Sequence, residues 1–218
     1  MASRTGPGPA AGSSSRTGFT RAELDAFRGR SIPDVVGPAP RLLLVGINPG
    51  LHTAAVQAPF SRPGNRFWPA LHRAGILNRV VDASAGLLPD DRAHLLARGV
   101  GITTLVAGAT ARADELTAQQ LRDGAASLDS RVAELMPRVV ALLGITTFRI
   151  AFGQPRAVVG RQPAGLAGAE LWVVPNPSGL NAHESVDSLA AAYRAVAVAA
   201  GIDVYPVPDP SVAGRPGT

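Results

Sequence analysis

The chain has 218 residues, of which 46% are hydrophobic, and it contains no cysteine. This is enough for one sizeable core, and it excludes disulfides, thiolate nucleophiles and Cys-based metal sites. Every basic side chain is an arginine, and the formal net charge of +5 suits an anionic partner such as nucleic acid without requiring one.

The four histidines, at positions 52, 72, 94 and 183, form no H-x-x-x-H or similar pair, so neither a metal site nor another cofactor is expected. Apolar runs end well short of the ~18 residues that a membrane-spanning helix needs. The N-terminal residues are rich in Gly, Ser and Pro and lack the apolar core of a secretory signal. A cytoplasmic location is therefore expected, beside the nucleoid if the source is a prokaryote.

Both ends of the chain have a composition typical of disorder. Residues 1–19 are a low-complexity stretch of Gly, Ser and Pro, and residues 203–218 are rich in Pro. We predict two tails that flank a single domain over residues 20–202.

The first half of that domain reads as one strand and three helices. Thr20 and Glu23 have the spacing of a capping box, which predicts a short helix. The continuous apolar run 41–46 predicts a buried strand, and a long loop is expected over 47–64. Helices are predicted over 65–75 and over 88–99, where Gly99 ends the second one.

In the second half of the domain, predicted strands and helices alternate more regularly. Short strands are predicted at 101–106, 139–144 and 170–175. Helices are predicted from a capping box at Thr117 and Gln120 towards Met136, over 145–153 and over 185–201. Strands that alternate with helices favour an α/β fold, here a three-layer α/β/α sandwich with a short central parallel sheet.

Two Asn–Pro turns lie at the carboxyl ends of predicted strands, GINPG at 46–50 and PNPSGLN at 175–181. Sites in parallel sheets lie at these ends, so both turns are expected to face one crevice. The phosphate-binding patterns G-x-x-x-x-G-K-[ST] and G-x-G-x-x-G are absent, and so is the G-x-S-x-G nucleophile turn.

The order GINPG at 46–50, PFSRPGNRFW at 59–68 and NPSGL at 176–180 resembles the mismatch-specific uracil/thymine-DNA glycosylases, a branch of the uracil-DNA glycosylase superfamily. The segment 101–124 is also similar, and the resemblance covers most of residues 40–200. It implies the fold of that family, no cofactor, and a monomer that acts on double-stranded DNA with a G·U or G·T mismatch.

Asn48 carries the chemistry that this resemblance implies. Cleavage of a base–deoxyribose bond passes through positive charge on the sugar, and a water molecule must add to C1′. A neutral amide cannot take a proton, but its oxygen can orient that water. The alternative is that Asn48 only caps its own turn through the backbone.

The resemblance also assigns the base contacts. Phe60 corresponds to an aromatic ring on which an extruded base stacks, and Ile47 contacts the base edge through its backbone. Asn65 either orients the Phe60 loop beside the base or caps the helix that starts there. Phe60 has an alternative role as well, which is to hold its loop against the core.

The turn at 176–181 resembles the loop that enters DNA. Leu180 is the expected wedge into the space that the flipped nucleotide leaves, and Gly179 and Asn181 are expected to offer backbone groups to the opposite base. Asn176 and Ser178 are expected to bind phosphates or to brace the loop. Phosphate contacts are also assigned to Arg62, Arg66 and His183, each of which is equally an ordinary surface residue. The family often has Arg two residues after the wedge, where this chain has Ala182.

Asp114 stands where some relatives have an amide. Facing the crevice, its carboxylate would share in activating the water and widen the range of substrates. Alternatively it is a surface or helix-cap charge.

We therefore expect a monofunctional glycosylase that removes uracil opposite guanine, with thymine or damaged pyrimidines as further candidates, and leaves an abasic site. The chain has no lysine to form a Schiff base with the sugar. Two alternatives remain open, a non-catalytic module that binds DNA mismatches or lesions, and a small-molecule α/β enzyme that holds a phosphate on the GINPG turn.

Overall fold

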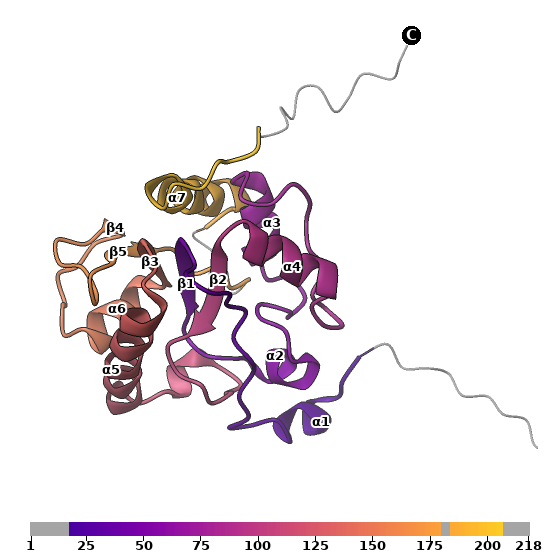
Figure 1. The fold of residues 1–218 in the computed structure, drawn as a ribbon. Helices are drawn as coiled ribbons and strands as arrows, with labels where there is room; N and C mark the ends of the chain where they lie inside the picture. The colour runs from indigo at the N-terminus through magenta and orange to yellow at the C-terminus, as the bar shows by residue number, and fades with distance from the viewer. Residues whose placement is uncertain (1–17, 180–183, 207–218) are drawn as a thin grey trace, which may run out of the picture.

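The computed structural model describes residues 18–179 and 184–206. Its centre is a five-stranded sheet in the order β2-β1-β3-β5-β4 (Figure 1). Four strands are parallel, and the short β4 pairs antiparallel with β5. The strands are β1 (Leu42–Gly46), β2 (Val100–Thr104), β3 (Val139–Leu143), β4 (Gly160–Arg161) and β5 (Glu170–Val174).

Helices cover both faces of this sheet, so the predicted three-layer α/β/α arrangement is confirmed (Figure 1). They are α1 (Arg21–Asp25), α2 (Leu51–Val56), α3 (Phe67–Arg73), α4 (Pro89–Ala97), η1 (Ala113–Glu115), α5 (Ala118–Leu135), α6 (Ile145–Ala151) and α7 (Val186–Ala199). Within the described ranges, no helix combines the length and apolarity that crossing a bilayer requires.

The interior strand β1 has an apolar side chain at each of its first four positions because both faces of the sheet are covered. Leu42 and Leu44 pack into the cluster beneath α3, α4 and α7. Leu43 and Val45 point the other way, into the cluster beneath α5 and α6. Alternation along an extended strand sends successive side chains to opposite faces, so a continuous apolar run is what a doubly covered strand requires.

The predicted helix starts are confirmed. The hydroxyls of Thr20 and Thr117 accept hydrogen bonds from the backbone N–H groups of Glu23 and Gln120, whose side chains bond back to the two cap residues. Gly99 follows α4 with a φ of +72°, a left-handed conformation that ends a helix at little cost for glycine.

Two short elements differ from the predictions. The loop expected over 47–64 contains α2, whose Leu51 and Ala54 pack on Ala109 in a small separate cluster. The edge strand β4, which pairs antiparallel with the next strand β5, was not expected either, because it has only two residues. Neither element has enough residues for a periodic apolar pattern.

Packing also extends into the predicted C-terminal tail. The Tyr205 N–H donates to the Gly75 carbonyl at 2.7 Å, and the Arg98 guanidinium lies 4.4 Å from the centre of the Tyr205 ring. The chain is therefore packed to Tyr205 rather than to 202. Disorder over residues 1–17 and 207–218 remains a prediction, because these residues lie outside the described part.

Candidate active site

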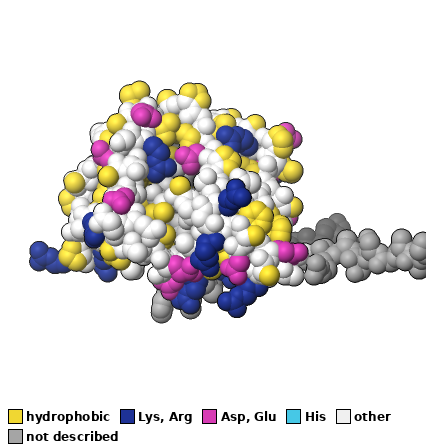
Figure 2. Space-filling model, turned by 90° about the horizontal axis from the view of Figure 1, so that it is seen from below, with side chains coloured by type: hydrophobic (Ala, Val, Ile, Leu, Met, Phe, Trp, Pro, Cys, Tyr) yellow, Lys and Arg dark blue, Asp and Glu magenta, His cyan; other side chains and the backbone are white. Residues whose placement is uncertain are grey.

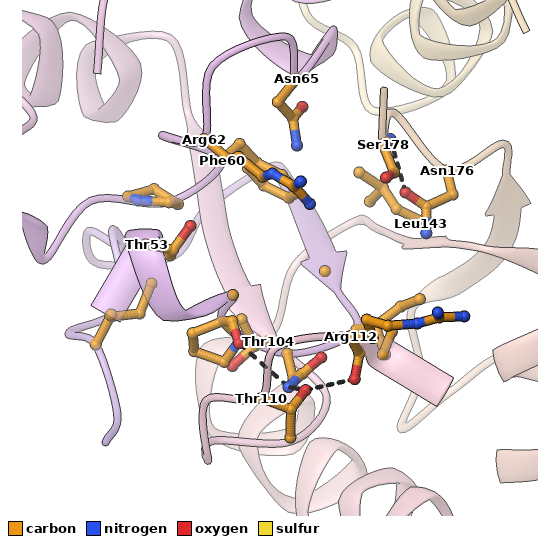
Figure 3. A pocket seen from close by; sticks show the side chains of 18 of the residues that line it. Thr53, Phe60, Arg62, Asn65, Thr104, Thr110, Arg112, Leu143, Asn176 and Ser178 are labelled. Atoms are coloured by element: carbon orange, nitrogen blue, oxygen red, sulfur yellow. Dashed lines mark hydrogen bonds between the residues drawn. The ribbon is translucent and has the colours of Figure 1, made fainter. Parts of the chain in front are cut away.

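The carboxyl ends of three parallel strands open onto one cavity of about 320 Å³. Gly46, Thr104 and Leu143, the last residues of β1, β2 and β3, contribute to its wall. Both Asn–Pro turns also line it, as predicted from their places at strand ends. The predicted site residues on its wall are Ile47, Asn48, Phe60, Arg62, Asn65, Asp114, Asn176 and Ser178, several of which Figure 3 shows around it.

The Asn48 amide is held by its nitrogen. Nδ2 donates to the Thr110 hydroxyl at 2.8 Å, to the Gly108 carbonyl at 3.0 Å and to the Pro49 carbonyl at 3.2 Å. The oxygen Oδ1 accepts no hydrogen bond from any described residue. The nitrogen is thus bound both within its own turn, at Pro49, and by the distant segment 108–110.

Phe60 lies with one face on the ring of Phe67, with centroids 3.7 Å apart and planes 18° apart. Its φ of +55° is an uncommon conformation for a non-glycine residue, which costs of order 1 kcal/mol or more. A side chain at Gly46 would lie 3.2 Å from the tip of the ring, so the glycine allows this close approach. Phe60 is therefore packed against the core and also forms part of the cavity wall.

Ile47 contributes to the wall between β1 and the Asn48 turn. Its carbonyl accepts from the Val106 N–H at 2.9 Å, and its side chain packs against the cluster under α5 and α6. The backbone at this position is thereby held in place.

Asn65 joins the start of α3 to the cavity. Its Oδ1 accepts from the N–H of Phe67, the first residue of α3, at 2.9 Å, although the N-cap position itself is Arg66. The amide nitrogen is directed into the cavity in Figure 3, near Phe60 and Arg62. This leaves Asn65 with a donor for a ligand, while Arg62 adds an exposed cation to the same rim.

Arg66 binds the protein backbone. Its guanidinium donates to the Ser178 carbonyl at 2.5 Å and to the Glu184 carbonyl, and its N–H donates to the Pro177 carbonyl at 3.0 Å. These contacts hold both ends of the segment that contains Leu180. Arg66 is therefore engaged by backbone carbonyls on either side of residues 180–183, whereas the sequence pointed to a phosphate or the surface.

The turn at Asn176 is closed locally, since Asn176 Oδ1 accepts from the Ser178 N–H at 2.9 Å (Figure 3). Gly179 approaches the 62–65 loop so closely that a Cβ there would lie 2.7 Å from the Gly64 carbonyl oxygen. Arg62, Ser178 and Gly179 are among the residues that line a second, adjacent hollow of about 270 Å³. Leu180, Asn181 and His183 lie outside the described residues.

Asp114 lies in η1 at the rim of the cavity. The Arg112 guanidinium donates hydrogen bonds to its carboxylate through two nitrogens, of which Nε lies at 3.0 Å. The carboxylate is 63% exposed. Among residues 18–179 and 184–206, no group of three or more His, Asp or Glu side chains is arranged to bind a metal ion.

Behind the Phe60 loop lies a small polar network. His52 Nδ1 is 3.2 Å from the Ser61 hydroxyl, which donates to the Thr53 hydroxyl at 3.4 Å. Burial lowers the pKa of His52 below its usual 6.5, and the charge of Arg62 lowers it further. Burial also lowers the pKa of His94. Both imidazoles are therefore preferentially neutral in the folded protein.

This depression makes stability depend on pH. A base whose folded pKa is lowered contributes stability above its unfolded pKa of 6.5 and loses it as the pH falls towards the folded value. We expect the free energy of unfolding to decrease as the pH falls through and below 6.5, and to decrease less in His52→Gln. Urea titrations of wild type and His52→Gln across this range measure it. Equal decreases in wild type and His52→Gln would contradict the assignment.

Thr110 is the residue at this site that sequence reasoning did not identify. It occurs in a run of small residues, GATAR, with no pattern that marks a ligand or catalyst. Its contact with Asn48 exists only because the 108–110 segment lies beside the GINPG turn, with Thr110 bridged to Gly50.

Comparison with known proteins agrees with this geometry. A solved structure with the same fold is the solution NMR structure of a proposed uracil DNA glycosylase from Methanosarcina acetivorans, at 16% identity and a TM-score of 0.54. The match covers 77% of this chain and 98% of that one. Residues 33–199, which include both Asn–Pro turns, match the family described as the uracil DNA glycosylase superfamily. The chain therefore belongs to the uracil DNA glycosylase superfamily, whose members are hydrolases that act on N-glycosyl bonds in DNA.

Proposed function

We propose that the chain is a monofunctional DNA glycosylase that flips uracil out of duplex DNA, preferentially opposite guanine, and excises it hydrolytically. The observation that carries this proposal is the Asn48 amide at the cavity wall, whose nitrogen is bound by three acceptors while its oxygen accepts no hydrogen bond from any described residue. The cavity volume of about 320 Å³ is typical of small-ligand sites.

The reaction divides between the base and the sugar. The C1′–N1 bond breaks with its electron pair on the base, which leaves as an anion, while C1′ becomes electron-poor. A water molecule that donates one hydrogen to Asn48 Oδ1 keeps a lone pair directed at C1′. Asn48 positions the water without taking its proton, so the proton released when the water adds to C1′ passes to the departing uracil anion or to bulk water. The mechanism therefore suits a good leaving group such as uracil.

The base would stack on Phe60, whose ring is backed by Phe67 and therefore needs no reorganisation on binding. The Asn65 nitrogen is a donor, which suits the carbonyl oxygens of uracil, because the Asn65 oxygen is already bound to the Phe67 N–H. A base with an amino group in place of that carbonyl would bring its own N–H donors against the N–H donors of Asn65, and no hydrogen bond could form.

DNA contacts would come from the loop that Arg66 supports, with Leu180 as the wedge and Arg62 near a phosphate. On the face seen in Figure 2, on the side of α1 and α2, arginines are interspersed with acidic side chains. Long-range attraction to DNA from this face is then modest, and we expect affinity to depend on specific contacts at the loop and the cavity.

A panel of labelled oligonucleotides tests the function. Wild-type protein is incubated with duplexes that carry G·U, A·U or G·T and with single-stranded uracil DNA. Strand breaks are scored before and after alkali. We expect breaks in the G·U duplex only after alkali, which indicates base loss without lyase chemistry. Binding without breaks would indicate a lesion-binding module, and neither binding nor breaks would overturn the proposal.

A further inference from the structure

The Thr110 hydroxyl has two partners that together define its direction. It lies 2.8 Å from Asn48 Nδ2 and 2.7 Å from the Arg112 carbonyl oxygen (Figure 3). A carbonyl can only accept, so the single hydroxyl hydrogen is used on Arg112. Towards Asn48 the hydroxyl therefore presents a lone pair.

The other neighbours of the Asn48 amide impose the same polarity. The carbonyls of Gly108 and Pro49 lie 3.0 Å and 3.2 Å from Nδ2. If the amide turned over, Oδ1 would face two carbonyl oxygens and a hydroxyl with no hydrogen to offer. Thr110 is the only side chain among these three acceptors, so it is the one that substitution can remove.

The hydroxyl is placed by a segment with little freedom. The Thr110 N–H donates to the Pro49 carbonyl at 3.2 Å, and Ala109 exchanges backbone hydrogen bonds with Arg30 and Gly29 at 2.9 and 2.8 Å. Ala109 is 1% exposed. The segment is thus bonded on both sides, to the turn that carries Asn48 and to the chain after α1.

We propose that Thr110 is a positioning residue that fixes the polarity of the Asn48 amide, so that Oδ1 rather than Nδ2 faces the attacking water. This inference rests on the proposed function. An oxygen accepts a hydrogen from the water and leaves its lone pair for C1′, whereas an N–H would bind that lone pair. Loss of the hydroxyl therefore removes one of the three contacts that prevent the unproductive orientation.

Thr110→Val removes the hydroxyl at nearly constant volume, and Thr110→Ser keeps it. Under single-turnover conditions with a G·U duplex, we expect Thr110→Val to lower the maximal rate about tenfold, the scale of one lost hydrogen bond. The enzyme concentration at half-saturation should be unchanged, and Thr110→Ser should restore most of the rate. Thr147→Val, which removes a buried hydroxyl of α6 that does not line the cavity, should leave the rate unchanged.

A double-mutant cycle with Asn48→Ala separates positioning from general support. If Thr110 acts through Asn48, Thr110→Val has no further effect once the amide is gone. Independent, additive losses of rate in the two variants would overturn the inference. A Thr110→Ser rate as low as that of Thr110→Val would also overturn it, and so would a Thr110→Val effect on the enzyme concentration at half-saturation alone. Thermal unfolding shows whether Thr110→Val folds. If it does not, Thr110→Ala is used in its place.

The proposed function can fail separately. Wild-type protein that leaves every uracil substrate intact would overturn the function, and the Thr110 inference with it. Excision by wild type together with an undiminished Thr110→Val rate would overturn the Thr110 inference alone.

Discussion

Asn48→Ala is expected to lower the single-turnover rate of uracil excision from a G·U duplex by roughly 100- to 1,000-fold, the usual effect of removing one preorganised polar group at a reacting centre. The variant keeps the cavity and the loop that would contact DNA, so its affinity for the duplex should change little. Quenched-flow sampling with alkali cleavage gives the rate, and fluorescence anisotropy with the same duplex gives the affinity.

The exposed Asn78 provides the matched control, because Asn78→Ala removes an amide far from the cavity wall. Its rate should equal that of wild type. Excision by Asn48→Ala at the wild-type rate would reject water positioning by this amide.

The same series decides what Asp114 does. If its carboxylate also helps to activate water, Asn48→Ala/Asp114→Ala will be slower than Asn48→Ala alone, and wild type will lose rate at acidic pH. If Asp114 is only the partner of Arg112 at an exposed rim, the double variant will match the single one.

Phe60→Ala should have the second-largest effect. Stacking of a base on an aromatic ring contributes roughly 1–3 kcal/mol, which corresponds to roughly 5- to 150-fold in kcat/KM. Alanine removes this face and leaves Phe67 uncovered at the bottom of the cavity. Steady-state or single-turnover titrations measure the loss, and Phe60→Tyr, which keeps the ring, should retain most activity.

The pair Phe148 and Phe152 offers the control for lost packing, since these rings also stack, with centroids 4.7 Å apart, but line no part of the cavity. Phe152→Ala should lower the thermal midpoint without a comparable loss of kcat/KM. If Phe60→Ala behaves in the same way, Phe60 serves the core and not the base.

Local patterns were sufficient for most of the fold. The continuous apolar runs that became β1, β3 and β5 ended within a residue of the predictions, because a strand covered on both faces needs apolar side chains at successive positions. The capping boxes at Thr20 and Thr117 were readable because both partners lie three residues apart. The elements that were missed, α2 and β4, are short, and α2 packs on the distant Ala109.

For the site, the amino-acid sequence by itself determined the chemical groups and their approximate address: a neutral amide at the end of the first strand, an aromatic on the following loop, and a second Asn–Pro turn at another strand end. Parallel strands present their carboxyl ends at one edge, so these groups had to meet. Only the tertiary structure decided how they are held. The acceptors that orient Asn48 come from residues 108 and 110, and the support of the 177–184 loop comes from Arg66. Hydrogen bonds between segments that are distant in the chain depend on the relative placement of backbone and side chains, and no local pattern encodes that placement.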